Sequence, residues 1–241
     1  MCGRYVSTSQ PDQIARYFGA EMSEAVVENA PPANYNVAPT AQVFVVVETG
    51  EVRRLETARW GLVPSWAKDL SIGAKMINAR AETLATKSAF KRAFQRRRCI
   101  VPADGFYEWQ VIPGQKRKQP MFIHRADGDR FAFAGLWELW RDPAAPDDLP
   151  LRTCTIITGE PNEAVSPIHD RMPVMLPPDS WSTWLDHENH DLDMLGRLLV
   201  PAPASIIGVH PVSTAVNNVR NRAAWLVDPV GLEADTQQTL L

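Results

Sequence analysis

Residues 41–64 read AQVFVVVETGEVRRLETARWGLVP, and this stretch decides the fold because it holds two β-rich runs on either side of a turn. The first run, Val43 to Val47, consists of valine and phenylalanine, which pack well in strands. Glu48-Thr49-Gly50 interrupts the apolar pattern with a glycine, which tolerates the backbone reversal of a tight turn. The pattern predicts an antiparallel hairpin with Trp60 near the end of its second strand.

Further strand-like segments follow this hairpin, and short helical patterns lie on both sides of them. The predicted strands are 106–112, 121–124, 131–137, 153–158 and 206–210, and the chain turns at 99–102 before the first of them. The predicted helices are a segment from Pro11 to the capping Gly19, a basic helix from Ser88, and the segments 180–185 and 191–199. Residues 65–87 read as irregular. The residues therefore predict a sheet-dominated α+β core flanked by short helices.

Length and composition fit one compact domain. At 241 residues with 45% hydrophobic residues, the chain can bury a core without dividing in two. Apolar runs such as Val43 to Val47 are too short to span a bilayer, and the N-terminus has no basic segment followed by an apolar stretch. We expect a protein of the cytoplasm without a membrane partner.

The cysteines do not form a recognisable framework. Cys2, Cys99 and Cys154 are an odd count with wide spacings, which match neither a disulfide scaffold nor a CxxC metal pattern. Neither a metal ion nor a cofactor is therefore expected.

The net charge of −3 conceals an asymmetry between the two halves of the chain. Residues 1–125 carry 18 Lys and Arg against 11 Asp and Glu, whereas residues 126–241 carry 7 against 17. Within the first half, the stretch from Lys75 to Arg98 holds eight basic residues and the single acid Glu82. Such a stretch is either a face that binds a polyanion or a solvated helix surface, and charge alone does not distinguish them.

Cys2 is the residue with the most distinctive chemistry. A side chain as small as that of cysteine allows Met1 to be removed, which would expose an α-amine beside a thiol, with ordinary pKa values of about 8 and about 8.5. The amine condenses with an aldehyde to an imine, and the thiol closes on the imine carbon to give a five-membered thiazolidine. The sequence therefore indicates covalent capture of an aldehyde, unless Cys2 is merely a small residue after the start codon.

Six ordered blocks of sequence carry a resemblance to a known family. The blocks are MCGRY at 1–5, NVAPT at 36–40, RWGLVPSWAKD at 59–69, INARAET at 77–83, RRCIVPADGFYEW at 97–109 and SPIHDRMPV at 166–174. Together they resemble the SRAP family, abasic-site processing proteins first described as SOS response-associated peptidases. The resemblance implies one SRAP domain over residues 1–225, with a mixed, barrel-like β core flanked by short helices. A polar, mobile tail is expected at 226–241.

The resemblance also implies a function and four catalytic residues. The chain is expected to sense abasic sites in single-stranded DNA and to crosslink to them through Cys2 as a thiazolidine, shielding the lesion in the DNA damage response. Active-site roles fall on Asn78, Glu108 and His169. Taken without the family, Glu108 is more typical of a solvent-facing or salt-bridged strand residue, His169 of a hydrogen-bonding loop residue and Asn78 of a cap or turn residue.

Each of these three side chains has a chemical reason to act. Glu108 stands between two aromatic residues, where desolvation can raise its pKa enough for proton exchange with the carbinolamine and imine. His169 can protonate the sugar ring oxygen, so that the closed abasic sugar opens to its aldehyde. Asn78 can hold the Cys2 amine or the sugar hydroxyls through its amide.

Basic residues near the catalytic candidates are predicted to contact DNA phosphates. Arg80 and Arg171 lie two residues beyond Asn78 and His169, so in extended backbone each would project on the same side as its catalytic neighbour. Arg4 is a weaker candidate for the same role.

Residues of the loop beside Cys2 and one tryptophan complete the predicted DNA contacts. Asn36, Pro39 and Thr40 are expected to shape that loop and to offer polar groups to the DNA. Trp66 can stack on an exposed base, an interaction worth about 1 to 3 kcal/mol. Trp60 is better suited to packing in the core.

Two other functional classes remain open. The chain can be an N-terminal-nucleophile autoprotease or hydrolase, in which the Cys2 thiolate attacks an amide; this activity suits removal of Met1. It can also be a noncovalent binding module for single-stranded nucleic acid, in which Cys2 is dispensable. A low lyase activity is expected if the imine forms without ring closure. The favoured partner is single-stranded DNA with abasic sites, bound by a monomer that is nucleoid-associated when on DNA.

Overall fold

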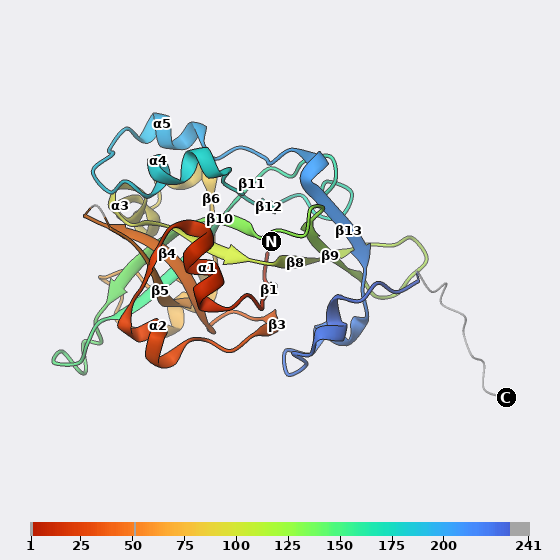
Figure 1. The fold of residues 1–241 in the computed structure, drawn as a ribbon, viewed down its shortest axis with the longest axis horizontal. Helices are drawn as coiled ribbons and strands as arrows, with labels where there is room; N and C mark the ends of the chain where they lie inside the picture. The colour runs from red at the N-terminus through yellow and green to blue at the C-terminus, as the bar shows by residue number, and fades with distance from the viewer. Residues whose placement is uncertain (1, 51, 232–241) are drawn as a thin grey trace.

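The fold is built on a closed barrel of five strands (Figure 1). The structure is a computed structural model that describes residues 2–50 and 52–231. The barrel strands are β4 Gln42–Thr49, β5 Val52–Trp60, β7 Arg98–Ala103, β10 Phe131–Trp140 and β11 Leu151–Gly159. Antiparallel pairing runs from β5 through β4, β7 and β10 to β11, and β11 returns to β5 in parallel. The predicted barrel-like, mixed β core is confirmed.

The predicted hairpin forms two neighbouring strands of this barrel. β4 and β5 pair from Gln42↔Arg59 to Thr49↔Val52, with Gly50 in the left-handed conformation at φ 61°. Trp60 ends β5, is fully buried and donates from Nε1 to the Ile77 carbonyl at 2.9 Å. Its role is packing in the core.

A second, antiparallel sheet lies beside the barrel. Its strands, in spatial order, are β13 Ile207–Pro211, β9 Gln119–Arg125, β8 Gly105–Gln110, β1 Tyr5–Ser7 and β3 Asn34–Val37. Only Asp104 separates β7 of the barrel from β8 of this sheet. Gly105 is required at this crossing, because a Cβ there would lie 2.4 Å from the Phe122 ring. The second sheet is thereby joined directly to the barrel.

The barrel strands bury side chains on both of their faces. Ile100 and Ala134 pack outward against α1 Pro11–Phe18, α3 Ser88–Arg96 and α4 Trp181–Leu185. Val101 and Phe133, one residue away in each strand, pack in a second cluster that continues to the smaller sheet and includes Cys2. This alternation is the two-residue period of β-strands. Cys2 therefore belongs to a continuous apolar core.

The remaining elements are short. They are β2 Glu21–Met22, α2 Glu24–Asn29, β6 Asn78–Arg80, β12 Met172–Pro173, α5 Leu192–Arg197 and the 3-10 helices η1 Leu70–Lys75, η2 Ala81–Thr83, η3 Pro178–Ser180, η4 Ala204–Ile206, η5 Thr214–Asn217 and η6 Ala224–Val227. The predicted strands and helices are confirmed with small shifts at their ends. The interpretation of 65–87 as irregular is wrong in one respect, because β6 pairs there in parallel with β11.

The structure describes part of the tail that the sequence predicts. Of the tail predicted at 226–241, residues 232–241 lie outside the described residues. Before them, Leu226 is fully buried and the Val230 amide donates to the Pro211 carbonyl at 2.9 Å.

In the described part of the chain, no helix has the length and apolar character needed to cross a membrane.

Candidate active site around Cys2

Cys2 lies in the core three positions before β1 begins at Tyr5, and its side chain is 0% exposed. Burial raises the pKa of its thiol, and the negative charge of Glu108 raises it further. The thiol makes a weak hydrogen bond of 3.9 Å to the Arg4 carbonyl. Because its pKa is raised, the resting thiol is protonated and needs a base before it can attack. The Cys2 nitrogen is a peptide nitrogen as long as Met1 precedes it.

Asn78 is held next to Cys2 by β6. This strand pairs with β11 at Asn78↔Ile156, and the Asn78 side chain donates from Nδ2 to the Cys2 carbonyl at 2.8 Å. The Oδ1 atom of the same amide is buried and has no hydrogen-bond partner among the described residues. A buried amide oxygen left without a partner is costly, so it is a ready acceptor for an incoming donor.

Glu108 brings a buried carboxyl to the same place from β8. Its side chain is almost fully buried, and desolvation raises its pKa to about 7, with a smaller contribution from the charge of Asp170. The raised pKa and its cause, desolvation, agree with the expectation, although the two aromatic neighbours are not what surrounds the carboxyl. Tyr107 and Trp109 pack in a separate cluster on the opposite face of β8, because neighbouring residues of a strand point to opposite sides. The apolar core around Cys2 desolvates Glu108 instead.

His169 completes the group from the loop between β11 and β12. Its Nε2 lies 3.9 Å from Oε2 of Glu108, and its Nδ1 accepts a hydrogen bond from the Arg171 amide at 3.0 Å. Burial lowers the pKa of His169, although the carboxylate of Asp170 acts in the opposite direction. The loop is tied to β8 by a hydrogen bond of 3.3 Å from Gln110 Nε2 to the Pro167 carbonyl. All four predicted catalytic residues therefore come together in the structure.

Arg4 and Asn36, two of the predicted DNA contacts, hold a C-terminal part of the chain beside Cys2. Arg4 donates from Nη1 to Asn36 Oδ1 and to the Val216 carbonyl, both at 3.0 Å. Asn36 is buried, and its Nδ2 donates to the carbonyls of Val216, Asn218 and Asn221. In the structure described, much of the hydrogen-bonding capacity of both side chains is thus used within the protein.

Arg171 is also engaged within the protein. Its guanidinium forms a two-pronged ion pair with Glu82 and donates to the Thr158 carbonyl at 2.6 Å. The hydrogen bonds from Arg171 hold the pKa of Glu82 down at about 2. Asp170 forms a bend before Arg171, so His169 and Arg171 are not related by an extended strand as the sequence had suggested.

The other predicted DNA contacts are more accessible. Trp66 is 60% exposed, and Arg80 is exposed on β6, where the strand places it on the same side as Asn78. Pro39 is half-buried, and the adjacent Thr40 is exposed with φ at 73°. A β-branched residue in this left-handed region is strained.

Lys118 is a neighbour of the site that the sequence interpretation left without a role. It is exposed near the start of β9, and its positive charge lowers the pKa of Glu108 and of His169, opposing the effect of burial at Glu108 and adding to it at His169. The basic run Lys116 to Lys118 is the signal in the sequence. Because this run lies outside the six blocks that carry the family resemblance, the sequence did not show that Lys118 lies beside the catalytic candidates.

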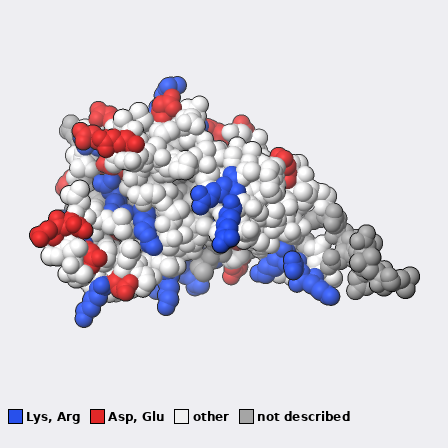
Figure 2. Space-filling view, turned by 90° about the horizontal axis from the view of Figure 1, so that it is seen from below, with Lys and Arg blue, Asp and Glu red and all other residues white. Residues whose placement is uncertain are grey.

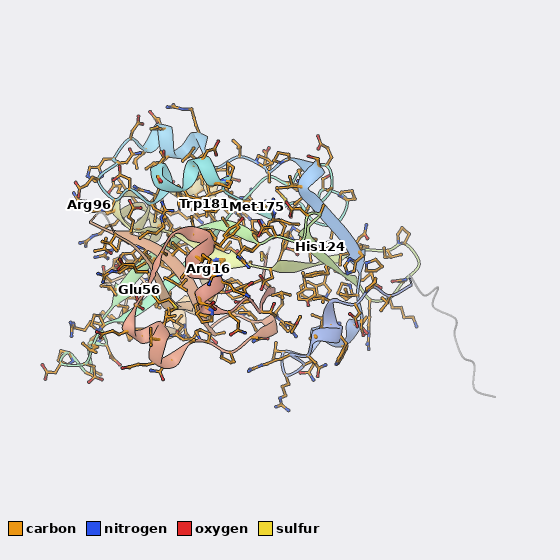
Figure 3. All side chains as sticks on the ribbon, viewed as in Figure 1. Arg16, Glu56, Arg96, His124, Met175 and Trp181 are labelled. Atoms are coloured by element: carbon orange, nitrogen blue, oxygen red, sulfur yellow. The ribbon has the colours of Figure 1, made fainter. Side chains whose placement is uncertain are left out.

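A separate apolar cavity of about 300 Å³ lies near α1 and α4. Met175 and Trp181, labelled in Figure 3, are among the residues that line it. The described residues of its lining include no cysteine, histidine or carboxylate, and Cys2 is not among them. The reactive groups are therefore gathered at Cys2 and not at this cavity.

Comparison with known proteins identifies related chains. The family model described as SOS response associated peptidase (SRAP) matches residues 1–219. The chain is 44% identical over 228 residues to the abasic site processing protein YoqW of Bacillus subtilis strain 168, covering 95% of this chain and 99% of that protein. It is 34% identical over 236 residues to the abasic site processing protein YedK of Escherichia coli K12, covering 95% and 100%.

A solved structure supports the fold independently. The crystal structure of a protein from Bacteroides thetaiotaomicron superposes with a TM-score of 0.84 and covers 95% of this chain and 100% of that chain. At 22% sequence identity, the similarity bears on the fold alone. It agrees with a single domain built on a mixed barrel.

Proposed function

The chain belongs to the SRAP family, and from this premise we propose that it captures abasic sites in single-stranded DNA through Cys2 once Met1 has been removed. The observation that carries the proposal is the meeting of Asn78, Glu108 and His169 around Cys2 from three separate parts of the chain. The relatives YoqW and YedK are named as abasic site processing proteins. An abasic sugar supplies the aldehyde that the chemistry of Cys2 requires.

The first step opens the abasic sugar. In its closed form the sugar is a hemiacetal, so an acid must protonate the ring oxygen while a base takes the proton of the anomeric hydroxyl. Glu108 and His169 lie 3.9 Å apart and can serve as this acid and base. The products are the aldehyde and a free sugar hydroxyl, and no atom is lost.

The second step forms the crosslink. The α-amine of Cys2 adds to the aldehyde carbon, and the carbinolamine loses water to give an imine. The buried thiol passes its proton to a base as its sulfur attacks the imine carbon, and the ring nitrogen gains a proton. Glu108, whose pKa lies at about 7, is suited to both transfers, because it exchanges protons readily at neutral pH. The net change is the loss of one water.

Asn78 orients the nucleophile in this proposal. Its Nδ2 holds the Cys2 carbonyl, and its Oδ1 is available to accept a hydrogen bond from the Cys2 amine or from a sugar hydroxyl. A fixed amine has less orientational freedom to lose when the aldehyde arrives. Asn78 is therefore proposed to act on the rate of capture.

The DNA strand is proposed to approach along the accessible residues around Cys2. Trp66 is exposed and suits base stacking, and Arg80 is exposed and suits phosphate binding. The loop at Thr40 is also exposed and can contact the strand. Arg4, Asn36 and Arg171 would contribute only the donors that their internal hydrogen bonds leave over. The Pro39 ring borders the same loop.

Crosslinking to an oligonucleotide with one abasic site tests the proposal. We expect an adduct that resists heat and denaturant, disappears in Cys2→Ala, and is blocked by an additional residue in front of Cys2. Cys154→Ala is the matched control, because it removes another fully buried thiol and should leave the adduct intact. An unchanged adduct in Cys2→Ala would contradict the proposal.

Two minor activities are proposed for the same site. The family description names a peptidase, and the thiol of Cys2 is suited to removal of Met1 by the chain itself. Mass spectrometry of Cys2→Ser should then detect retained Met1 more often than in the wild type. Because an imine also permits β-elimination, a protein whose thiol cannot close the ring should cut the abasic strand slowly. Strand cleavage by Met1-free Cys2→Ser measures this lyase activity.

A further inference from the structure

The C-terminal segment, residues 212–231, is packed against the strands that carry the candidate site. Arg4, two residues after Cys2, donates to the Val216 carbonyl, and Trp109, next to Glu108, donates from Nε1 to Asn217 Oδ1 at 2.7 Å. Figure 1 shows η5 and η6 of this segment beside β3. The segment thus packs on the face of β8 opposite Glu108, and it reaches the residues that follow Cys2 through Arg4.

The exposed part of this segment has a composition suited to contact with nucleic acid. Residues 217–225 read NNVRNRAAW, and all except Asn221 are exposed, including Trp225 at 48%. No Asp or Glu stands between Asp193 and Asp228, although the second half of the chain is acidic overall. Arginine, asparagine and tryptophan are residues that bind phosphates and stack on bases.

The two arginines of this run are available for an external partner. Arg220 and Arg222 are exposed, and neither takes part in the ion pairs found within residues 2–50 and 52–231. Arg171 differs, because its charge is paired with Glu82. On the face in Figure 2, Lys and Arg side chains continue toward the C-terminal end of the molecule, where Asp and Glu side chains are sparse.

A cavity of about 270 Å³ lies directly beside Arg222. Pro31, Pro32 and Val43 contribute apolar surface to it, and Asn34, Gln42 and Arg222 contribute polar groups. The volume is just below the range of small-molecule sites, about 300 to 1,000 Å³, and suits a single base. Ser7 also lines the cavity and follows Cys2 by five residues, so at about 3.5 Å per residue the two lie at most about 18 Å apart.

We propose that Arg220, Arg222 and this cavity bind a nucleotide of the single strand that flanks the captured abasic site. The guanidinium groups contact phosphates, and the cavity receives the unstacked base, with apolar contact from the two prolines and hydrogen bonds from Asn34 and Gln42. This inference rests on the proposed function, since it concerns the strand that Cys2 captures. It adds a noncovalent subsite that holds the strand before the covalent bond forms.

Salt-dependent binding of an undamaged single-stranded oligonucleotide to the full chain tests the phosphate contacts. In Arg220→Ala/Arg222→Ala we expect affinity lower by about tenfold, and a slope of log affinity against log salt reduced by about 1.4, because each contact to a single strand contributes about 0.7. Arg16→Ala/Arg197→Ala is the matched control, since it removes two exposed charges from α1 and α5. Its slope should equal that of the wild type.

A second variant tests the cavity from a different element. Gln42→Trp, at the exposed start of β4, fills the cavity and should weaken binding to the ordinary strand but not to a strand of the same length whose backbone carries no bases. The wild type should prefer the ordinary strand to the base-free one, and Gln42→Trp should lose most of that preference.

The outcomes separate this inference from the proposed function. The subsite would be overturned if Arg220→Ala/Arg222→Ala kept the affinity and salt slope of the wild type and Gln42→Trp kept the full preference for bases. Normal crosslinking would then leave the Cys2 proposal standing. Conversely, crosslinking that persists in Cys2→Ala would sink the proposed function alone, because undamaged strands are bound without any reaction at Cys2.

Discussion

The Nε2 atom of His169 lies 3.9 Å from Oε2 of Glu108, and burial moves the pKa values of the two groups toward each other. The pKa of Glu108 rises to about 7, whereas that of His169 falls below its ordinary value of 6.5. Burial thus favours the uncharged form of both groups, the carboxylic acid of Glu108 and the neutral imidazole of His169. Because the groups are close, they titrate as a pair. A protonated carboxyl beside a neutral imidazole is an acid and a base ready for use.

Glu108→Gln should slow crosslinking on the order of a hundredfold, because the amide cannot exchange a proton with the carbinolamine or imine. In the wild type, the rate should change most steeply near pH 7, where Glu108 titrates. Single-turnover crosslinking between pH 5 and pH 9 measures both effects. Binding of undamaged strands is the control, and a parallel loss of binding would identify Glu108 as a structural residue.

The same substitution should alter stability in a pH-dependent way. The folded pKa of Glu108 is about 7, above its ordinary value of 4.5, so the wild type loses stability as the pH rises from about 4.5 to about 7. Relative to the wild type, Glu108→Gln should gain up to about 3 kcal/mol between pH 4 and pH 8. Urea unfolding at the two pH values measures the gain, and an equal effect of the substitution at both would rule out this account.

Asn78→Asp should reduce the rate of capture at saturating DNA on the order of tenfold, since it removes the donor to the Cys2 carbonyl and places a second carboxylate near Glu108. Affinity for undamaged single strands should change little. Asn78→Ala distinguishes the two causes, because it removes the donor without adding charge. A loss confined to binding would show that Asn78 contacts the strand and does not orient Cys2.

The ion pair between Arg171 and Glu82 should stabilise the fold in a defined pH window. The folded pKa of Glu82 is about 2, below its ordinary 4.5, so this stabilisation is present above about pH 4.5 and is lost as the pH falls to about 2. Because the Glu82 side chain is 54% exposed, Glu82→Gln should cost no more than about 1 kcal/mol. Arg171→Ala should cost about 1 to 3 kcal/mol, since it also leaves the Thr158 carbonyl without its donor. A double-mutant cycle followed by urea unfolding measures the coupling, and additive effects would contradict the pairing.

Thr40→Asn should stabilise the protein by about 0.5 to 1 kcal/mol, because asparagine tolerates the left-handed backbone better than a β-branched residue. Thr49→Asn, in the extended backbone of β4, is the matched control and should not stabilise. Thermal unfolding compares the two variants. If Thr40→Asn is neutral or destabilising, the conformation of Thr40 is not a source of strain.

The local parts of this fold can be predicted from the sequence, and the non-local parts cannot. Gly50 and the valines of β4 specify the hairpin through turn geometry and strand propensity. The parallel return of β11 to β5, which pairs Thr153 with Arg59, joins segments that share no local pattern. β6 was missed because three residues are too few to establish a period.

The candidate site likewise has features that can be predicted from the sequence and features that cannot. The residue types of Cys2, Glu108 and His169 suggest their chemistry, and the SRAP resemblance brings them together. The burial of Glu108 depends on which face of β8 meets the core, and the internal partners of Arg171 and Asn36 depend on tertiary contacts. None of these can be inferred from neighbours along the chain.

The hydrogen bond from Arg4 to the Val216 carbonyl joins residues 212 positions apart, and this separation constrains the order of assembly during synthesis. Cys2 is among the first residues to leave the ribosome, yet the contact that anchors the strand after it requires a segment translated near the end. The pocket around the nucleophile is therefore incomplete for most of translation. Truncation before Val216 would remove this hydrogen bond while β1 kept its pairing with β3 and β8, so the last part of the domain to be made completes the surroundings of the first.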